Sequence, residues 1–166
     1  NSLSLNNSKI KSADLLSIKI SKSLVAWKNN KSDEAINYLK ELLEESETTY
    51  LYETLTSLLI VNNKLDDALT IIDKGLNYND TSNVLKSNFA EANYLLGNYN
   101  VAEVKFKELV DSNVSFMEPY YYLGLILLNN NENDAALEIL KKATLFNDSL
   151  VSLVNCEKIK NLITSI

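Results

Sequence analysis

The sequence predicts an all-α protein built from repeated helix pairs. Its 166 residues include only three Gly and one Pro, which leaves few residues for the corners of an all-β fold. Apolar residues recur at three- and four-residue spacing, as they do in amphipathic helices, and Leu65, Ala68, Leu69 and Ile72 form one such set. Short links rich in Asn and Gly separate these segments, and both residues tolerate the left-handed backbone that ends a helix.

The chain also repeats itself every 34 residues, which is the third observation behind an all-α repeat fold. Ala68, Ala102 and Ala136 are spaced by 34 twice over. The same register holds four further sets: Leu55, Phe89 and Leu123; Thr56, Ala90 and Gly124; Asn63, Gly97 and Asn131; Ile72, Phe106 and Leu140.

This pattern resembles the tetratricopeptide repeat (TPR) family, whose unit reads W-x2-L-G-x2-Y, then A-x3-F, then P. The fourth unit fits best, with Tyr120-x2-Leu123-Gly124 followed by Ala136-x3-Leu140. The first unit fits least well, because Lys22 and Ser23 stand at the Leu-Gly positions, although Ala35-x3-Leu39 keeps the second-helix signature. The resemblance covers about residues 15–148.

The closing Pro of the family is absent from every unit. Asp80, Val114 and Asp148 stand at its positions. Because Asp is a good N-cap, we expect Asp80 and Asp148 to start the helix that follows, whereas Val114 cannot.

The resemblance implies an all-α, right-handed TPR-type α-solenoid of about four helix-turn-helix units followed by a C-terminal capping helix. The units are expected within residues 12–148, at about 15–48, 49–82, 83–116 and 117–148. Residues 1–11, rich in Ser and Asn, are expected to form a flexible N-terminal arm. Residues 149–166 are expected to form the cap. The repeat frame puts Lys158 at the small-residue position, where a lysine does not allow a close helix contact, and the terminal cap of a solenoid has one solvent-exposed polar face.

Composition argues against several functional classes. The chain has no His, no Arg and no Gln, beside 23 Asn. Without His it lacks the usual base for nucleophilic catalysis and the imidazole metal ligand. A net charge of −6 disfavours nucleic acid and anionic membrane as partners. No apolar run reaches the roughly 18 to 20 residues that span a bilayer, so we expect no membrane insertion by this segment.

We therefore expect no enzyme activity, no cofactor and no metal site. Asn129-Asn130-Asn131 superficially resembles a calcium loop, but Asp134 and Leu140 stand where such a loop needs Gly and Glu, so an inter-helix turn is expected there. The lone cysteine, Cys156, permits no intrachain disulfide, which slightly favours an intracellular compartment. Because the sequence starts at Asn1, we read it as part of a longer or processed chain, whose targeting segment can lie elsewhere.

The resemblance also implies a concave groove lined by the first helix of each unit. Carried onto this sequence, the groove positions include ten candidate partner-binding residues: Trp27, Tyr50, Glu53, Ser57, Ser87, Glu91, Tyr94, Glu118, Tyr121 and Leu125. Some TPR modules capture a terminal carboxylate through a clamp of Lys, Asn and Arg. No such clamp can form here, because those positions hold Ile20, Glu53, Ser87 and Tyr121.

The predicted groove is acidic and aromatic, with almost no Lys. It favours a protein-protein interaction or assembly module that binds a peptide or helix with apolar anchors and basic residues. The alternative is a structural domain of a larger chain or homo-oligomer, with the groove filled by its own flanking segment. Self-association is compatible with either interpretation, and neither identifies the partner.

Overall fold

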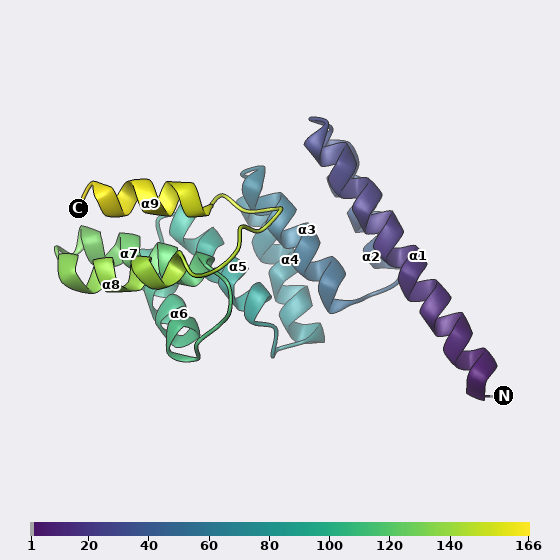
Figure 1. The fold of residues 1–166 in the computed structure, drawn as a ribbon. Helices are drawn as coiled ribbons and strands as arrows, with labels where there is room; N and C mark the ends of the chain where they lie inside the picture. The colour runs from purple at the N-terminus through teal and green to yellow at the C-terminus, as the bar shows by residue number, and fades with distance from the viewer. Residues whose placement is uncertain (1) are drawn as a thin grey trace. The chain divides into compact units, whose positions relative to one another are not determined.

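The computed structural model describes residues 2–166, with side chains from residue 14 onward. In this part of the chain all regular structure is helical (Figure 1). The helices are α1 (Ser2–Lys28), α2 (Ser32–Glu45), α3 (Thr49–Val61), α4 (Leu65–Tyr78), α5 (Asn83–Leu95), α6 (Tyr99–Asp111), α7 (Glu118–Asn129), α8 (Asn133–Ala143) and α9 (Cys156–Thr164). The first eight form four successive pairs that follow the 34-residue period, so the all-α repeat fold is confirmed.

The chain divides into two compact units, Asn1–Leu51 and Tyr52–Ile166. In the first unit α1 packs on α2, and the buried Ser23 hydroxyl donates to the Ala35 carbonyl oxygen at 2.9 Å. Lys19 and Glu45 form an ion pair at 3.0 Å beside that contact. The backbone of α1 is helical from Ser2. The arm expected at residues 1–11 falls where the side chains lie outside the described residues, and it stays a prediction.

Each turn inside a helix pair passes through one residue in the left-handed region. The φ angles are 62° at Asn30, 56° at Asn63, 85° at Gly97 and 63° at Asn131. In the third pair Gly97 takes this conformation, and Asn98 lies just before α6. Asn is the non-glycine residue that most readily adopts a positive φ, because its short amide can bond locally. The segment Asn129–Asn131 is accordingly the α7–α8 turn.

The helix starts differ from the expectation based on Asp80. Ser82 is the N-cap of α5, and its Oγ accepts from the Leu85 amide at 3.1 Å. Asp80 lies two residues earlier, so its expected capping role is wrong. Asp148 lies well before α9, whose N-cap is Asn155, yet its Oδ1 accepts from the Cys156 amide at 2.7 Å.

Small residues set the packing within the pairs of the second unit. A Cβ placed on Gly124 would lie 2.6 Å from Cγ and Cδ2 of Leu140, so α7 can approach α8 this closely only without a side chain there. Ala68, Ala102 and Ala136 are fully buried at the equivalent positions of the second helices. The repeated small residues therefore hold close helix contacts, as the sequence pattern predicts.

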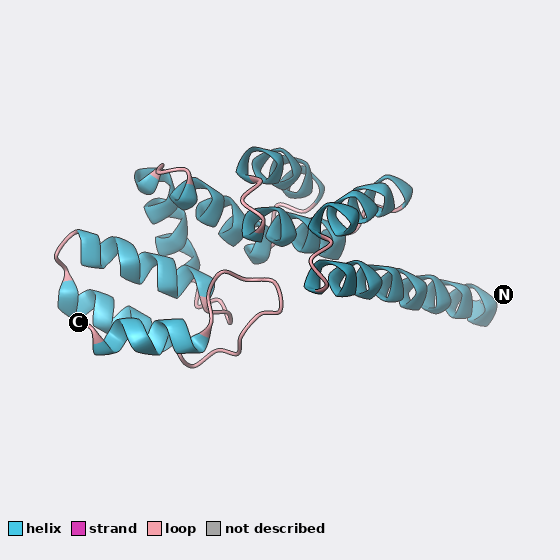
Figure 2. Ribbon diagram, turned by 90° about the horizontal axis from the view of Figure 1, so that it is seen from above, coloured by secondary structure: helices cyan, strands magenta, loops and turns pink. Residues whose placement is uncertain are grey.

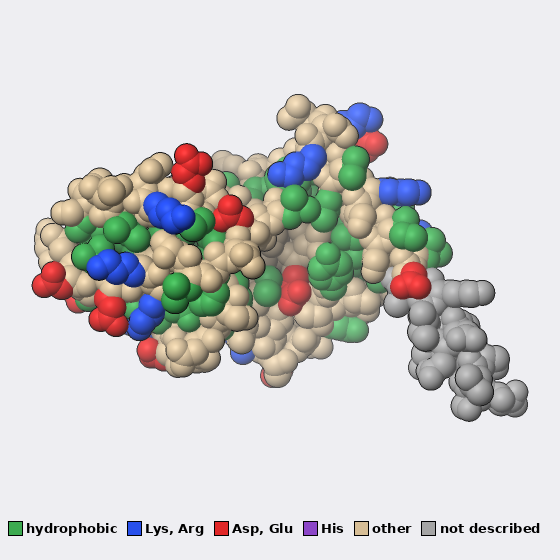
Figure 3. Space-filling model, in the orientation of Figure 1, with side chains coloured by type: hydrophobic (Ala, Val, Ile, Leu, Met, Phe, Trp, Pro, Cys, Tyr) green, Lys and Arg blue, Asp and Glu red, His purple; other side chains and the backbone are tan. Residues whose placement is uncertain are grey.

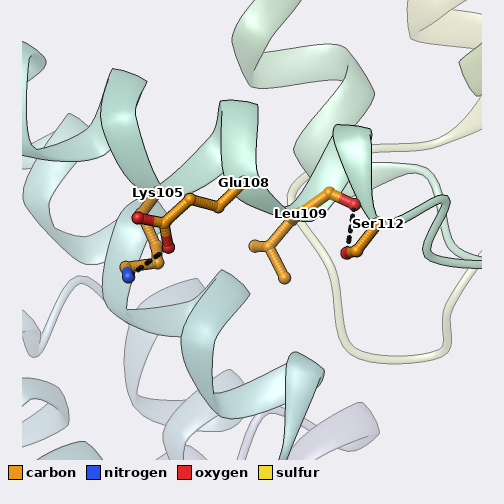
Figure 4. A network of polar contacts seen from close by, with 4 residues as sticks. All are labelled: Lys105, Glu108, Leu109 and Ser112. Atoms are coloured by element: carbon orange, nitrogen blue, oxygen red, sulfur yellow. Dashed lines mark hydrogen bonds and ion pairs between the residues drawn. The ribbon is translucent and has the colours of Figure 1, made fainter.

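The outward face of α6 carries charged side chains together with the exposed Val101 and Val104. Lys105 and Glu108 form an ion pair one turn apart, and the Ser112 hydroxyl donates to the Leu109 carbonyl oxygen at 2.8 Å at the end of the helix (Figure 4). Leu109 itself is buried. An exposed pair of this kind contributes little to stability, so burial of the opposite face holds α6 in place.

The last helix is shorter than the predicted cap. α9 begins at Cys156, and residues 149–155 form an irregular connection from α8 (Figure 2). Val154 and Ile159 are buried in the same hydrophobic cluster as Tyr121, so α9 lies against the α7–α8 pair (Figure 1). The helix starts late because the amide oxygen of Asn155 caps it, accepting from the Lys158 amide at 2.8 Å.

The surface carries mixed charge. Over the part of Figure 3 where α8 and α9 lie, Lys and acidic side chains are interspersed with hydrophobic atoms. Among the described residues, no helix is both long enough and apolar enough to cross a membrane.

Candidate functional site: a polar cavity between three first helices

A cavity of about 150 Å³ lies in the unit Tyr52–Ile166. Its lining comes from the first helix of three successive pairs and from the connection that leads to α9. The residues are Ser57, Ile60 and Val61 of α3; Val84, Ser87, Asn88 and Glu91 of α5; Phe116 and Glu118 at the start of α7; and Ser149, Val151 and Ser152. The repeat register places seven of these twelve at groove positions, namely all except Asn88, Phe116 and the connection residues.

The helix α5 supplies the polar centre of the cavity. Ser87 and Glu91 are four residues apart and therefore share one helix face. Asn88 lies beside them and is buried; its Nδ2 donates to Thr56 Oγ1 at 2.7 Å and to Ser57 Oγ at 3.1 Å. These bonds tie α5 to α3 and fix the wall of the cavity between the two helices.

The Ser87 hydroxyl is buried and unsatisfied within the described part of the chain. Its side chain is 2% exposed, and its Oγ has no hydrogen-bond partner among the residues that the structure describes. An unsatisfied buried hydroxyl costs free energy, about 1–3 kcal/mol. A hydrogen bond from a ligand atom to this hydroxyl would remove that cost.

Glu91 is a buried carboxyl group, 5% exposed. Tyr122 of α7 donates its phenol hydrogen to Glu91 Oε1 at 2.7 Å. The pKa of Glu91 is raised from its ordinary 4.5 to about 7, chiefly by burial and to a smaller extent by Glu118, against the opposing effects of the Tyr122 hydrogen bond and Lys158. Within the described part of the chain, neither Glu91 nor Glu118 takes part in an ion pair.

The position of Tyr122 is set by aromatic packing. Its ring stacks on that of Phe106, with the ring centroids 5.4 Å apart and an angle of 8° between the ring planes. The centroid of the Tyr94 ring lies 5.0 Å from that of Tyr122. Burial raises the pKa of the Tyr122 phenol, so it stays protonated and remains a donor to Glu91. Packing therefore holds the hydrogen bond at Glu91 in a fixed geometry.

Other predicted groove residues of this unit have structural contacts. The Glu53 Oε1 accepts from Ser82 Oγ at 2.7 Å, which ties α3 to the start of α5. Tyr94 is half-buried. Its ring packs against Tyr122 and also against Tyr99, with the Tyr94 and Tyr99 ring centroids 5.2 Å apart.

The fourth pair is covered where the groove was expected to be open. Tyr121 is only 5% exposed, and Lys158 of α9 lies 5.3 Å from its ring centroid. Leu125 is partly buried against the same cluster. With α9 in place, Tyr121 is not available as the open anchor that the sequence suggested.

Two of the ten candidates belong to the unit Asn1–Leu51. Trp27 is partly exposed, and Lys28 Nζ lies 4.6 Å from its ring centroid. Tyr50 is an exposed aromatic residue near the start of α3. Neither residue is among those that line the cavity of the unit Tyr52–Ile166.

Sequence reasoning missed the contributions of Asn88, Tyr122 and the connection residues. One signal was present in the sequence: Ser87, Asn88 and Glu91 are polar residues close together on one helix, and buried polar residues need partners. The folding of residues 149–152 back onto the groove has no such signal. Among the described residues, no group of His, Cys, Asp or Glu side chains is arranged to hold a metal ion.

Comparisons with known proteins bear on the fold. The family model described as tetratricopeptide repeat matches residues 16–49 and 118–149. Both segments are displaced by one residue from the expected first and fourth units. No curated protein matches the sequence.

Several solved structures share the fold. A structure of MamA from Desulfovibrio magneticus RS-1 has a TM-score of 0.62 and 19% identity, and the alignment covers 78% of this chain and 73% of that one. Another MamA structure has a TM-score of 0.61 and 18% identity, with coverage of 92% and 86%. Identities this low establish likeness of fold only. The family-model matches identify tetratricopeptide repeats at residues 16–49 and 118–149, and the solved structures share the fold of the chain.

Proposed function

We propose that this protein is a non-enzymatic binding module that takes up a peptide or helix with apolar anchors and a basic residue at the cavity between α3, α5 and α7. The observation that carries the proposal is the composition of the wall: Ile60, Val61 and Val84 lie beside the carboxyl groups of Glu91 and Glu118. Apolar walls bind a side chain through burial, and acidic groups select a cationic one.

The cavity is small compared with a protein interface. It is therefore the place for one anchor residue, and the rest of the partner would contact the surrounding groove. Interfaces of this kind depend on a few well-buried anchors. The TPR fold supports a protein or peptide as partner, and we propose no catalytic role.

The proposal is tested with a library of cationic-apolar peptides, labelled with fluorescein and followed by anisotropy. Glu118→Lys reverses a charge in the wall, and Val84→Ser removes an apolar side chain. We expect Glu118→Lys to weaken binding at least tenfold and Val84→Ser severalfold. Glu138→Lys, on an exposed site of α8, is the matched control and should leave binding within twofold. If peptides bind and neither wall variant weakens them, the groove assignment is wrong.

A second candidate function has an observation of its own. The connection residues Ser149, Val151 and Ser152 line the cavity, and α9 covers Tyr121. These contacts favour a structural domain that fills part of its own groove. A synthetic peptide of residues 149–166, added in excess to the intact protein, distinguishes the two. Displacement of a bound library peptide would mean that the two compete for the same surface, whereas no displacement argues for an independently open cavity.

The same two candidates differ in self-association. Size-exclusion chromatography with light scattering measures it directly. A stable homo-oligomer would favour the structural domain. A monomer that binds library peptides favours the binding module.

A further inference from the structure

The cavity is lined by residues from two helices that carry oxygen acceptors. Ser87 and Glu91 come from one face of α5, and Glu118 from the first turn of α7. Ser87 Oγ is buried and has no partner among the described residues. Both carboxyl groups lack an ion-pair partner in the same part of the chain. Burial of the Glu91 carboxyl group is costly when the group is ionised, and Lys158 offsets this cost only in part, because the pKa remains raised to about 7.

We propose that this cavity is a specific site for a primary ammonium group, and that the residue it takes from a partner is lysine. This rests on the proposed function and adds the chemical identity of the anchor. A primary ammonium carries three donors on one nitrogen, which matches the oxygens of Ser87, Glu91 and Glu118. The cavity size fits as well, because about 150 Å³ holds a ligand as large as benzene, and the aliphatic end of lysine is no bulkier.

Arginine fits this wall less well. Its guanidinium is a planar fork that bonds best to one carboxylate in a bidentate manner. Here one oxygen of Glu91 already accepts from Tyr122 at 2.7 Å, and Glu118 comes from a different helix. Ile60, Val61 and Val84 line the rest of the cavity, where the methylene groups of a lysine can lie.

The groups that face Glu91 also set how binding depends on pH. Tyr122 and Glu118 approach it from α7, and Lys158 from α9; burial keeps the pKa of Glu91 near 7. An ammonium binds the ionised form best. Its affinity should therefore rise with pH through about 7 and level off above that, and bound ammonium should lower the pKa of Glu91.

The experiment uses the intact protein at pH 8 and 150 mM salt, with n-butylammonium chloride as the probe and 1-butanol as the uncharged isostere. Carbon-13 NMR of the Glu91 carboxyl group reports both binding and the pKa. We expect saturable binding of butylammonium, at least tenfold tighter than that of butanol, and a fall of about one unit in the Glu91 pKa. 1-Butylguanidinium should bind at least threefold more weakly.

Matched variants separate the site from general charge. Glu91→Gln keeps the shape and should weaken butylammonium binding at least tenfold. Ser87→Ala should weaken it severalfold while leaving the free protein equally or more stable, because a buried unsatisfied hydroxyl is removed. Glu138→Gln removes one exposed charge and should change nothing. Equal binding of butanol, unchanged binding by Glu91→Gln, or equal binding of the guanidinium would overturn the proposal.

A second arm separates this inference from the proposed function. A library peptide that binds the protein is remade with each lysine replaced by norleucine. We expect the anchor replacement to reduce affinity at least tenfold. Binding that survives every replacement overturns the lysine site but leaves the binding module standing. Butylammonium binding without binding of any peptide supports the ammonium site and counts against the binding module.

Discussion

The third and fourth helix pairs use the same repeat positions in opposite ways. Ser87 and Tyr121 occupy equivalent positions, 34 residues apart, as do Glu91 and Leu125. The third pair presents its two residues to a cavity, whereas the fourth has its two against other side chains, with Lys158 over Tyr121. The difference arises from what packs next: Val154 of the connection and Ile159 of α9 are buried in the cluster that contains Tyr121, so this C-terminal segment covers the fourth pair. Ser87, Glu91 and Tyr121 are all buried, so the neighbouring element decides whether a repeat position borders a cavity or packs against other side chains.

The largest effect should come from weakening the packing of α9 on the fourth helix pair. Ile159 is fully buried in the cluster that contains Tyr121. Ile159→Ala should lower the free energy of unfolding by about 2–5 kcal/mol, because it removes apolar contacts and leaves a cavity. Urea unfolding followed by circular dichroism measures it, and amide hydrogen exchange should show α9 opening before α7 and α8. Lys160→Ala, exposed on the same helix, is the control. A loss no larger than that of the control would mean that α9 does not hold the fourth pair closed.

The second effect concerns Glu91 in the wall of the cavity and depends on pH. Glu91 has a folded-state pKa of about 7, against an ordinary 4.5. The folded state therefore binds more protons than the unfolded state between these values, so the free energy of unfolding must fall as pH rises from about 4.5 to about 7. The full difference is about 3 kcal/mol.

Glu91→Gln isolates this contribution, because its side chain does not titrate. We expect the variant to gain stability relative to the parent as pH rises through the same window, and the gain to level off above about pH 7. Urea unfolding at a series of pH values checks the trend. The control Glu138→Gln should run parallel to the parent protein. If Glu91→Gln also runs parallel to it, Glu91 is not buried as a charged group.

The smallest effect tests the link between the two regions. Lys158 lies over Tyr121 and lowers the pKa of Glu91. Lys158→Met keeps the aliphatic length but removes the charge. It should cost about 0.5–1 kcal/mol of stability through the lost cation–π contact, and the Glu91 pKa should rise further. Carbon-13 NMR of Glu91 and thermal unfolding give the two readings, with Lys160→Met as control. An unchanged Glu91 pKa would separate the covered region from the cavity.

The sequence predicted the fold well because the repeat is a local property. The spacing of Ala68, Ala102 and Ala136 reports close helix contacts, and Asn63 and Asn131 report left-handed turns. It also placed Ser57, Ser87, Glu91 and Glu118 on the groove face, since register alone decides which helix face a residue occupies. The predicted N-cap of α5 was wrong, because several neighbouring residues can cap a helix: Ser82 rather than Asp80 is the N-cap.

The rest of the site depends on contacts between residues far apart in the chain. Asn88 bonds to α3, and Tyr122 is aimed at Glu91 by its stacking on Phe106; no local pattern encodes either contact. The return of residues 149–152 onto the groove is equally non-local. A sequence-based estimate could not have found the raised pKa of Glu91, because it comes from burial.

By itself, the sequence determined an acidic helical repeat without His or Arg, together with its turns, because helix periodicity and backbone preferences act over a few residues. Only the tertiary structure decided which of the repeat positions line the cavity, which are covered by α9, and which carboxyl group is buried without an ion pair among the described residues. Those properties depend on desolvation and packing between distant segments, which repeat spacing does not specify.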